Sequence, residues 1–181
     1  MTDNPYTLLN SQTMYSCPWY RVRQDKLLLP DGSPGEYNVI LRPDAVYIVP
    51  VLESGELVLI RNYRHTINSW LWEIPAGSNE PSLSPLENAQ KELAEEIGGT
   101  AKSFNKLGVF YTIPGVSNEA GHFYLAQGVT LGEPNHEPSE VIERYTLSLE
   151  RVEQMLRRGE IQDGPSALAL HLALPHLNGV K

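Results

Sequence analysis

The first third of the chain alternates short apolar runs with turn residues, a pattern typical of β-hairpins. Two segments with a strand-like pattern, at residues 20–29 and 37–41, flank the turn sequence Pro-Asp-Gly-Ser-Pro-Gly. Two more, at residues 45–51 and 56–61, flank the sequence Leu-Glu-Ser-Gly. The run at 45–51 is apolar enough for a central strand, although Pro50 limits its pairing. The pattern predicts two successive hairpins.

A helical period replaces this pattern in the middle of the chain. Apolar residues recur there at spacings of three and four, at Leu86, Ala89, Leu93 and Ile97. Ser84, Pro85 and Glu87 have the order of a capping box with its proline at the first helical position. The Gly-Gly pair after Ile97 can end the helix in the left-handed conformation. We predict a helix from about residue 85 to about residue 97.

The second half of the chain adds strands and a final pair of helices. Strands are predicted over residues 107–111, 122–127 and 141–147, and the last of them follows a polar, proline-containing loop. Ser148 can cap a helix over residues 149–158 that ends at a glycine. A last helix is predicted to open at Pro165 and to end at Pro175.

The order of these elements predicts the fold class. Strands that run into one amphipathic helix, then more strands and two helices, predict an α/β (α+β) fold with a mixed central sheet between helical layers. At 181 residues the chain has the size of one domain with a small additional subdomain. We expect a β-hairpin region over residues 1–43 and the main domain over residues 44–181.

Three glutamates share one side of the predicted central helix. At about 100° per residue, Glu92, Glu95 and Glu96 fall within an arc of about 100° beside the apolar stripe. Like charges at these spacings cost a helix about 0.2 to 0.5 kcal/mol per pair, whereas a bound cation makes the arrangement favourable. Hard oxygen ligands suit Mg²⁺ or Mn²⁺, whose shell substrate phosphate commonly completes. The alternative interpretation is a solvated acidic helix face.

The segment around these glutamates resembles the Nudix box. That pattern is Gly, five residues, Glu, seven residues, then Arg-Glu-apolar-x-Glu-Glu-x-Gly-apolar. The residues that match it in register are Gly77, Glu92, Leu93, Glu95, Glu96 and Gly98. Leu83 and Lys91 stand where the family has the Glu and Arg that brace the loop against the helix, and Gly99 replaces an apolar residue.

Flanking segments extend the resemblance over about residues 19–174, toward the ADP-ribose pyrophosphatase branch of the family. Residues 61–64 are similar to its Gln-Tyr-Arg run, and residues 72–77 to its Trp-Glu-apolar-Pro-Ala-Gly run. Residues 111–119 resemble its Pro-Gly loop, and residues 140–143 the acidic loop that supplies its catalytic base. The resemblance implies a Nudix-like α/β/α sandwich and a homodimer, with the N-terminal region at the dimer interface.

The resemblance also implies roles for the acidic residues. The implied metal ligands are the carboxylates of Glu92, Glu95 and Glu96 and the backbone carbonyl of Ala76. Glu96 would also act in catalysis, and Glu140 would be the general base. Other carboxylates lie close in the same loop, so Glu137 and Glu143 remain alternatives for the base.

Three further residues are implied to bind substrate. Arg64 would contact phosphate, which suits guanidinium geometry, or else lie free on the surface. Trp19 would stack on an adenine, or else pack in the core or at an interface. Glu119 would bind the ribose or a metal-bound water.

The implied activity is Mg²⁺-dependent hydrolysis of a nucleoside diphosphate linked to another moiety. The first candidate is ADP-ribose, cleaved to AMP and ribose 5-phosphate, with metal ions neutralising the diphosphate and a loop glutamate taking a proton from the attacking water. A nucleotide sugar such as GDP-mannose is the second candidate. A protein of this fold that binds such a ligand without cleaving it is a third.

Composition limits the partners and the compartment. A net charge of −8 without a Lys/Arg run argues against nucleic acid, and it requires metal ions beside any bound diphosphate. No apolar run is long enough to span a bilayer, so we expect no membrane partner. The single cysteine, Cys17, excludes an intrachain disulfide and favours a cytoplasmic setting. The five histidines have no metal-ligand spacing.

Overall fold

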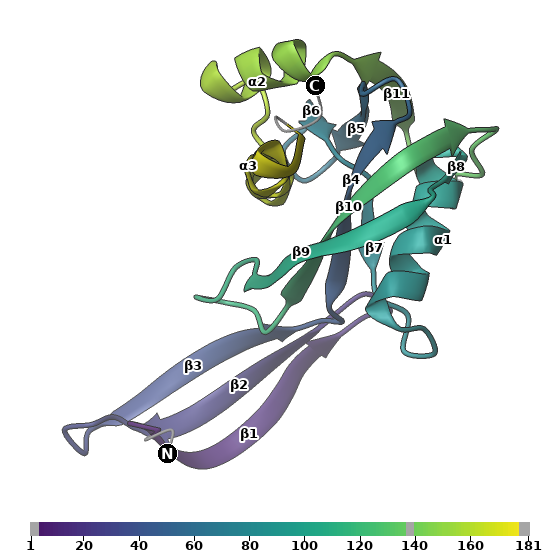
Figure 1. Cartoon of the computed structure of the whole chain (residues 1–181). Coiled ribbons are helices and arrows are strands. Elements are labelled where there is room, and N and C mark those ends of the chain that lie inside the picture. The colour runs from purple at the N-terminus through teal and green to yellow at the C-terminus, as the bar shows by residue number, and fades with distance from the viewer. Residues whose placement is uncertain (1–3, 137–139, 178–181) are drawn as a thin grey trace. The chain divides into compact units, whose positions relative to one another are not determined.

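The computed structural model of the chain describes residues 4–136 and 140–177 (Figure 1). It divides into two compact units, of which the first contains Met1–Asp44 and Tyr111–Ala120 and the second contains Ala45–Phe110 and Gly121–Lys181. Among the described residues, no helix has both the length and the apolar character needed to cross a membrane.

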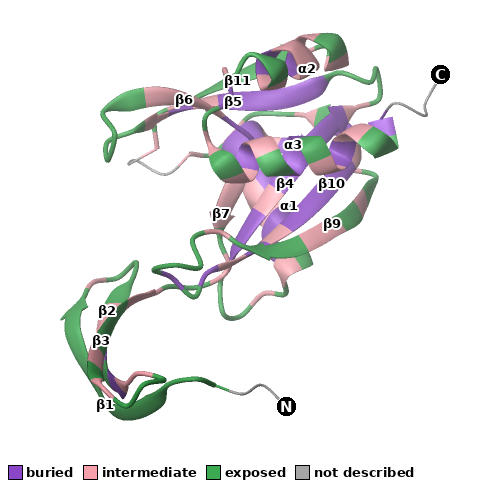
Figure 2. Cartoon of the chain, turned by 90° about the vertical axis from the view of Figure 1, so that its left-hand side faces the viewer, coloured by how far each residue is buried: buried purple, intermediate pink, exposed green. Residues whose placement is uncertain are grey.

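The first unit is built on a three-stranded antiparallel sheet. Its strands, adjacent in chain order, are β1 (Thr7–Ser16), β2 (Arg21–Leu28) and β3 (Pro34–Leu41). The strands β2 and β3 form the predicted hairpin, whose turn places Gly32 at a φ of 82°. The strand β1 was missed in the sequence because it lacks a buried face: every one of its residues is exposed (Figure 2).

The second unit is built on an eight-stranded mixed sheet. The strands are β4 (Ala45–Leu52), β5 (Leu57–Arg64), β6 (Ser69–Glu73), β7 (Ala76–Ser78), β8 (Gly99–Thr100), β9 (Ser103–Tyr111), β10 (Ala120–Leu131) and β11 (Ile142–Leu147). The central order is β11-β5-β4-β10-β8, with β6 beside β5, β7 beside β4 and β9 beside β10. The strands β4 and β10 run parallel, whereas β5 is antiparallel to β4, β6 and β11.

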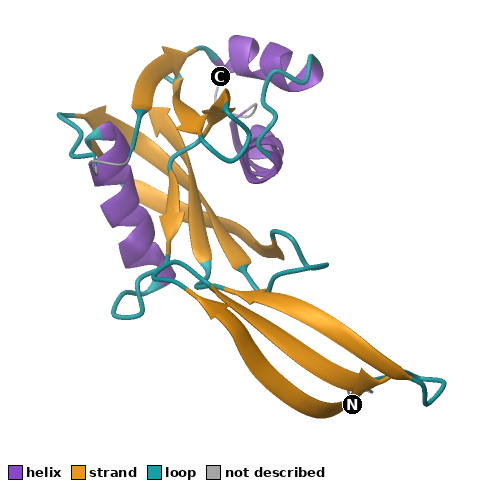
Figure 3. Ribbon diagram, turned by 180° about the vertical axis from the view of Figure 1, so that it is seen from behind, coloured by secondary structure: helices purple, strands orange, loops and turns teal. Residues whose placement is uncertain are grey.

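Helices cover both faces of this sheet (Figure 3). The helix α1 (Pro85–Ile97) covers one face, where Leu93 packs on Val46 and Ile48 of β4 within one buried cluster. The helices α2 (Leu149–Arg157) and α3 (Gly164–Leu177) cover the other face, with a second cluster between them and the sheet. The predicted sandwich with a mixed central sheet is confirmed.

Two details of the helices differ from the prediction. The last helix continues through Pro175 to Leu177, so the expected end at Pro175 was wrong. Proline there removes a backbone N–H in the last turn, where the loss of one hydrogen bond is tolerated more easily than in the middle of a helix. Leu86 is 39% exposed instead of joining the apolar stripe, and the buried position in this part of α1 belongs to Asn88.

Candidate active site

The helix α1 is fixed at both ends. The Ser84 backbone N–H donates to the Glu87 carboxylate at 2.8 Å, and the Glu87 backbone N–H donates to the Ser84 hydroxyl, which completes the predicted capping box. At the other end Gly98 has a φ of 64°, and a Cβ atom on it would lie 2.4 Å from the carbonyl oxygen of Gly132. Only glycine fits there, so the phase of the three glutamates on α1 is well defined.

Glu96 is buried and points at the loop that precedes the helix. It is 4% exposed, and its carboxylate accepts a hydrogen bond of 3.0 Å from the backbone N–H of Ala76. Burial raises the pKa of Glu96 well above its usual value, and the negative charges of Glu92 and Glu140 raise it further. The bond from Ala76 favours the ionised form but does not outweigh burial.

Glu92 lies against the same loop at Gly77. A Cβ atom built on Gly77 would lie 2.2 Å from the carboxyl carbon of Glu92, so any side chain at position 77 collides with this carboxylate. Burial raises the pKa of Glu92 to about 7, and repulsion from Glu95, Glu140 and other carboxylates adds to the shift, whereas Lys91 opposes it. The folded protein alone therefore stabilises the ionised forms of Glu92 and Glu96 poorly.

Glu95 has a different partner. Its carboxylate forms an ion pair with Lys91, and the Lys91 ammonium also lies 3.2 Å from Glu80 in the loop before the helix. The hydrogen bond to Glu95 is the largest cause of a pKa of Lys91 well above its usual value. Lys91 thus links α1 to the loop through Glu80, although Leu83 cannot serve as the partner that the family pattern has at that position.

Asn88 makes a second link between α1 and the loop. Its side chain is fully buried, donates to the carbonyl of Ser78 at 3.2 Å and accepts from the backbone N–H of Glu80 at 3.3 Å. Sequence reasoning missed both Asn88 and Glu80. The signal for Asn88 is its position beside the buried Ala89, whereas the pairing of Glu80 has no signature in a single sequence.

These residues fit a divalent cation. Among residues 4–136 and 140–177, no three His, Cys, Asp or Glu side chains are arranged as a ready-made metal site, and Glu95 is engaged with Lys91. Glu92 and Glu96 nevertheless offer only oxygen donors, on one helix face against one loop, and both have raised pKa values. A cation held between them would remove their repulsion and stabilise the ionised carboxylates.

Arg64 lies at the end of β5 in a fork with Glu73. Its Nε donates to Glu73 Oε1 at 2.8 Å and its Nη2 donates to Glu73 Oε2 at 2.6 Å. This hydrogen bonding is the largest cause of a raised pKa of Arg64, and the charges of Asp163 and Glu96 contribute to it. The positive charge of Arg64 thus interacts with the negative charge of Glu96. The other terminal nitrogen of its guanidinium remains for a further partner.

The negative charge of Glu140 acts on the same two glutamates. This charge helps to raise the pKa values of Glu92 and Glu96, although burial is the larger cause for both. The two alternatives for the base differ from it in position. Glu143 accepts a hydrogen bond of 2.9 Å from the Tyr145 hydroxyl, and Glu137 lies outside the described residues.

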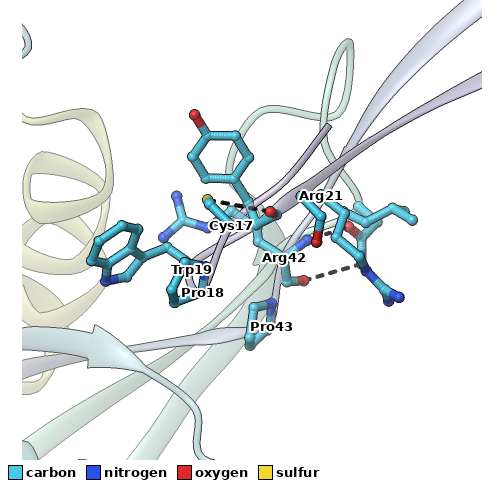
Figure 4. A pocket seen from close by; sticks show the side chains of 10 residues that line it. Cys17, Pro18, Trp19, Arg21, Arg42 and Pro43 are labelled. Carbon is cyan, nitrogen blue, oxygen red and sulfur yellow. Dashed lines mark hydrogen bonds between the residues drawn. The ribbon is translucent and has the colours of Figure 1, made fainter. Parts of the chain in front are cut away.

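Trp19 belongs to the first unit, where it lines a pocket of about 410 Å³. Figure 4 shows Trp19 beside Cys17 and Pro18 in the turn after β1, together with Arg42, which follows β3. Trp19 is 75% exposed, so its ring does not pack in a hydrophobic core of this chain. Asn118 also lines this pocket, and its side chain forms two hydrogen bonds with the backbone of Arg42.

Glu119 is buried in the same unit at 3% exposure. Its carboxylate lies 2.8 Å from the Arg42 guanidinium and accepts a hydrogen bond of 2.5 Å from the Thr112 hydroxyl. The structure thus assigns Trp19 and Glu119 to the first unit, and the other six predicted site residues to the second: Arg64, Ala76, Glu92, Glu95, Glu96 and Glu140.

Comparison with known proteins gives consistent matches. The sequence model of the NUDIX domain matches residues 41–168, and that of the nucleoside diphosphate sugar hydrolase N-terminal domain matches residues 6–40. The chain is 31% identical over 144 residues to an ADP-ribose pyrophosphatase of Bacillus subtilis, which covers 78% of each protein. It is 31% identical over 178 residues to an ADP-ribose pyrophosphatase of Mycobacterium tuberculosis, over 94% of this chain and 86% of that protein. A crystal structure of an ADP compounds hydrolase matches with a TM-score of 0.85 at 25% identity, over 96% of this chain and 95% of that one.

Proposed function

The chain belongs to the Nudix family and is a hydrolase, and from this we propose that it cleaves ADP-ribose to AMP and ribose 5-phosphate with Mg²⁺ as cofactor. Mn²⁺ is the second candidate for the metal, since it accepts the same oxygen ligands. Similarity to two ADP-ribose pyrophosphatases over most of the chain supports this substrate.

The observation that carries the proposal is the buried pair Glu92 and Glu96. Two carboxylates with raised pKa values, packed against the loop at Ala76 and Gly77, are unfavourable in the protein alone. We propose both as metal ligands together with the Ala76 carbonyl, and Glu95 as a third carboxylate once it leaves Lys91. A bound divalent cation would neutralise the diphosphate and lower the pKa of water.

The other predicted site residues have separable tasks. Glu140 is our candidate for the general base, because its charge reaches both glutamates from a neighbouring loop. Arg64 is held by Glu73 and offers its remaining nitrogen to a phosphate oxygen. Trp19 would stack on the adenine, and Glu119, held by Arg42, would bind the ribose or a water molecule.

Two other functions have specific support. The match of residues 6–40 to a nucleoside diphosphate sugar hydrolase domain favours a nucleotide sugar such as GDP-mannose as an alternative substrate. The replacement of the family's bracing pair by Leu83 and Lys91 favours a ligand-binding protein without turnover. The links that Lys91 and Asn88 make to the loop weaken this second alternative, because they supply a brace of another composition.

We also propose a homodimer in the cytoplasm. The strand β1 exposes Leu8, Leu9, Met14 and Tyr15, each by more than half, which is an apolar surface suited to a second copy of the chain. The lone free thiol of Cys17 suits a reducing compartment.

The experiment that tests the function is a phosphate-release assay with a coupled phosphatase. It compares ADP-ribose, GDP-mannose and other nucleoside diphosphate derivatives, each with Mg²⁺ and with chelator. We expect Mg²⁺-dependent release of AMP, with the highest kcat/KM for ADP-ribose. A higher kcat/KM for GDP-mannose would favour the nucleotide-sugar alternative, and tight binding without product would favour the binding protein.

A further inference from the structure

The last turn of α1 is capped by the loop that leads to Glu140. The backbone N–H of Asn135 donates to the carbonyl of Glu95 at 2.8 Å, and Nε2–H of His136 donates to the carbonyl of Glu96 at 2.8 Å. The final carbonyls of a helix have no partner within the helix, so these bonds satisfy groups that otherwise need water. They also attach the start of the loop to the residues that carry the candidate metal ligands.

Arg144 completes this cap from the other side of the loop. Its Nη1 donates to the carbonyl of Ile97 at 2.5 Å and to the carbonyl of Gly132 at 2.9 Å. Ile97 ends α1, Gly132 opens the loop, and Arg144 lies in β11 beyond the loop. One guanidinium therefore joins both flanks of the Glu140 loop to the end of the helix.

The register of β11 explains why Arg144 reaches the helix. Arg144 pairs with Ile60 of β5, and Ile60 and Ile142 both pack in the buried cluster beneath α1. Side chains two residues apart share a face of a strand, so Arg144 lies on the α1 face of the sheet. A positive charge at the C-terminal end of a helix is also favourable with respect to the helix dipole.

We propose that Arg144 is a positioning residue that keeps Glu140 near Glu92 and Glu96. The inference rests on the proposed function, because it takes Glu140 as the base. Arg144 follows Glu140 by only four residues, so restraint at Arg144 limits the positions that the Glu140 carboxylate samples. Among the described residues, the Arg144 side chain contacts the carbonyls of Ile97 and Gly132 and none of the candidate metal or substrate ligands, so we expect its loss to lower the rate of proton removal and to leave binding nearly unchanged.

The test compares Arg144→Met with Arg144→Lys and with a matched control, Arg151→Met. Arg151 is also a partly exposed arginine with two hydrogen bonds, to Glu160, but it lies in α2 on the opposite face of the sheet. We expect Arg144→Met to lower kcat by about 10- to 100-fold with KM nearly unchanged. Lysine should restore part of kcat, because one nitrogen of Arg144 serves both carbonyls. Arg151→Met should leave kcat unchanged.

Amide hydrogen exchange at Asn135 gives a second readout that needs no turnover. We expect exchange there to accelerate by about tenfold in Arg144→Met and to stay unchanged in Arg151→Met. An unchanged kcat, or equal losses of kcat in both methionine variants, would overturn the proposal. If the wild type hydrolyses no nucleoside diphosphate, the proposed function fails, and exchange at Asn135 still decides whether Arg144 anchors the loop.

Discussion

The carboxyl group of Glu92 lies against the α-carbon of Gly77, so closely that a Cβ atom at position 77 would lie 2.2 Å from its carboxyl carbon. The φ of Gly77 is not in the left-handed region, so backbone conformation does not require a glycine here. The close approach of the Glu92 carboxylate does. The next residue of α1 on this side, Glu96, contacts the preceding loop residue, Ala76. The loop at Ala76 and Gly77 thus contacts both glutamates of α1, and each of these contacts can be tested separately.

Gly77→Ala should displace Glu92 and weaken metal binding. The added methyl group has no space unless the carboxylate moves, so we expect Mg²⁺ affinity to fall by about 10- to 100-fold, a range typical of changes beside metal ligands. Calorimetric titration with Mg²⁺ measures this. Gly164→Ala is the matched control, because a Cβ atom there meets nothing within 4 Å. Equal Mg²⁺ affinity in both variants would contradict the role of Gly77.

Glu92 predicts an unusual pH dependence of the metal-free protein. Its pKa is about 7 when folded, whereas a glutamate in an unfolded chain has a pKa of about 4.3. Between these values the folded state binds more protons at Glu92, so stability is highest below this window and falls as the pH rises through it, by on the order of 1 to 3 kcal/mol. Thermal melts in chelator from pH 5 to pH 8 check this.

The variant Glu92→Gln isolates this contribution. It should flatten the fall in stability between pH 5 and pH 8, since glutamine does not titrate. Saturating Mg²⁺ should flatten it in the wild type, because the metal favours the ionised carboxylate. Parallel pH profiles for wild type and Glu92→Gln in chelator would mean that Glu92 titrates normally.

Asn88→Ala should loosen the loop before α1. It removes two part-buried hydrogen bonds, to the Ser78 carbonyl and from the Glu80 N–H, which we expect to cost about 1 to 3 kcal/mol of unfolding free energy. Denaturant unfolding measures the cost. Asn105→Ala removes an exposed side-chain hydrogen bond to Gln127 and should stay within about 0.5 kcal/mol of the wild type. If the two variants lose the same stability, the Asn88 link is not a brace.

Glu140→Gln should lower turnover by about 10² to 10⁴ and leave Mg²⁺ affinity intact, as expected for loss of a general base. Steady-state kinetics together with Mg²⁺ titration separate the two effects. Glu143→Gln tests the alternative base in the same way, and we expect it to keep its turnover, since Glu143 is exposed and bonded to Tyr145. Unchanged turnover in Glu140→Gln would move the role to Glu143 or Glu137.

Local signals in the sequence predicted the helix α1 and five of the eight strands of the mixed sheet, but not β6, β7 and β8. The order Ser84, Pro85 and Glu87 predicted the start of α1, and Gly98 its end, because caps depend on a few neighbouring residues. Strand β1 was not predicted, since a strand without a buried face has no alternating pattern. The passage of α3 through Pro175 was also missed, because tertiary packing of Leu177 stabilises the last turn beyond the proline.

The partners within the site were harder to predict. Helical phase placed Glu92, Glu95 and Glu96 on one side of α1, but it does not show that Glu95 turns to Lys91. That pair has the i,i+4 spacing of a helix ion pair, which is a signal that the sequence contains. The contacts of Glu80 and Arg144 join segments distant in the chain, and only the folded sheet brings these together.

The most direct test of the metal site is a set of thermal melts on wild type and Glu96→Gln at pH 8, in chelator and in excess Mg²⁺. Without metal, the variant should be as stable as the wild type or slightly more stable, because glutamine can accept the bond from Ala76 without a buried charge. At about 100 times the dissociation constant, Mg²⁺ should stabilise the wild type by about 2.7 kcal/mol and the variant far less. An equal Mg²⁺-induced rise in melting temperature in both proteins would contradict the account, since Glu96 would then not be a ligand.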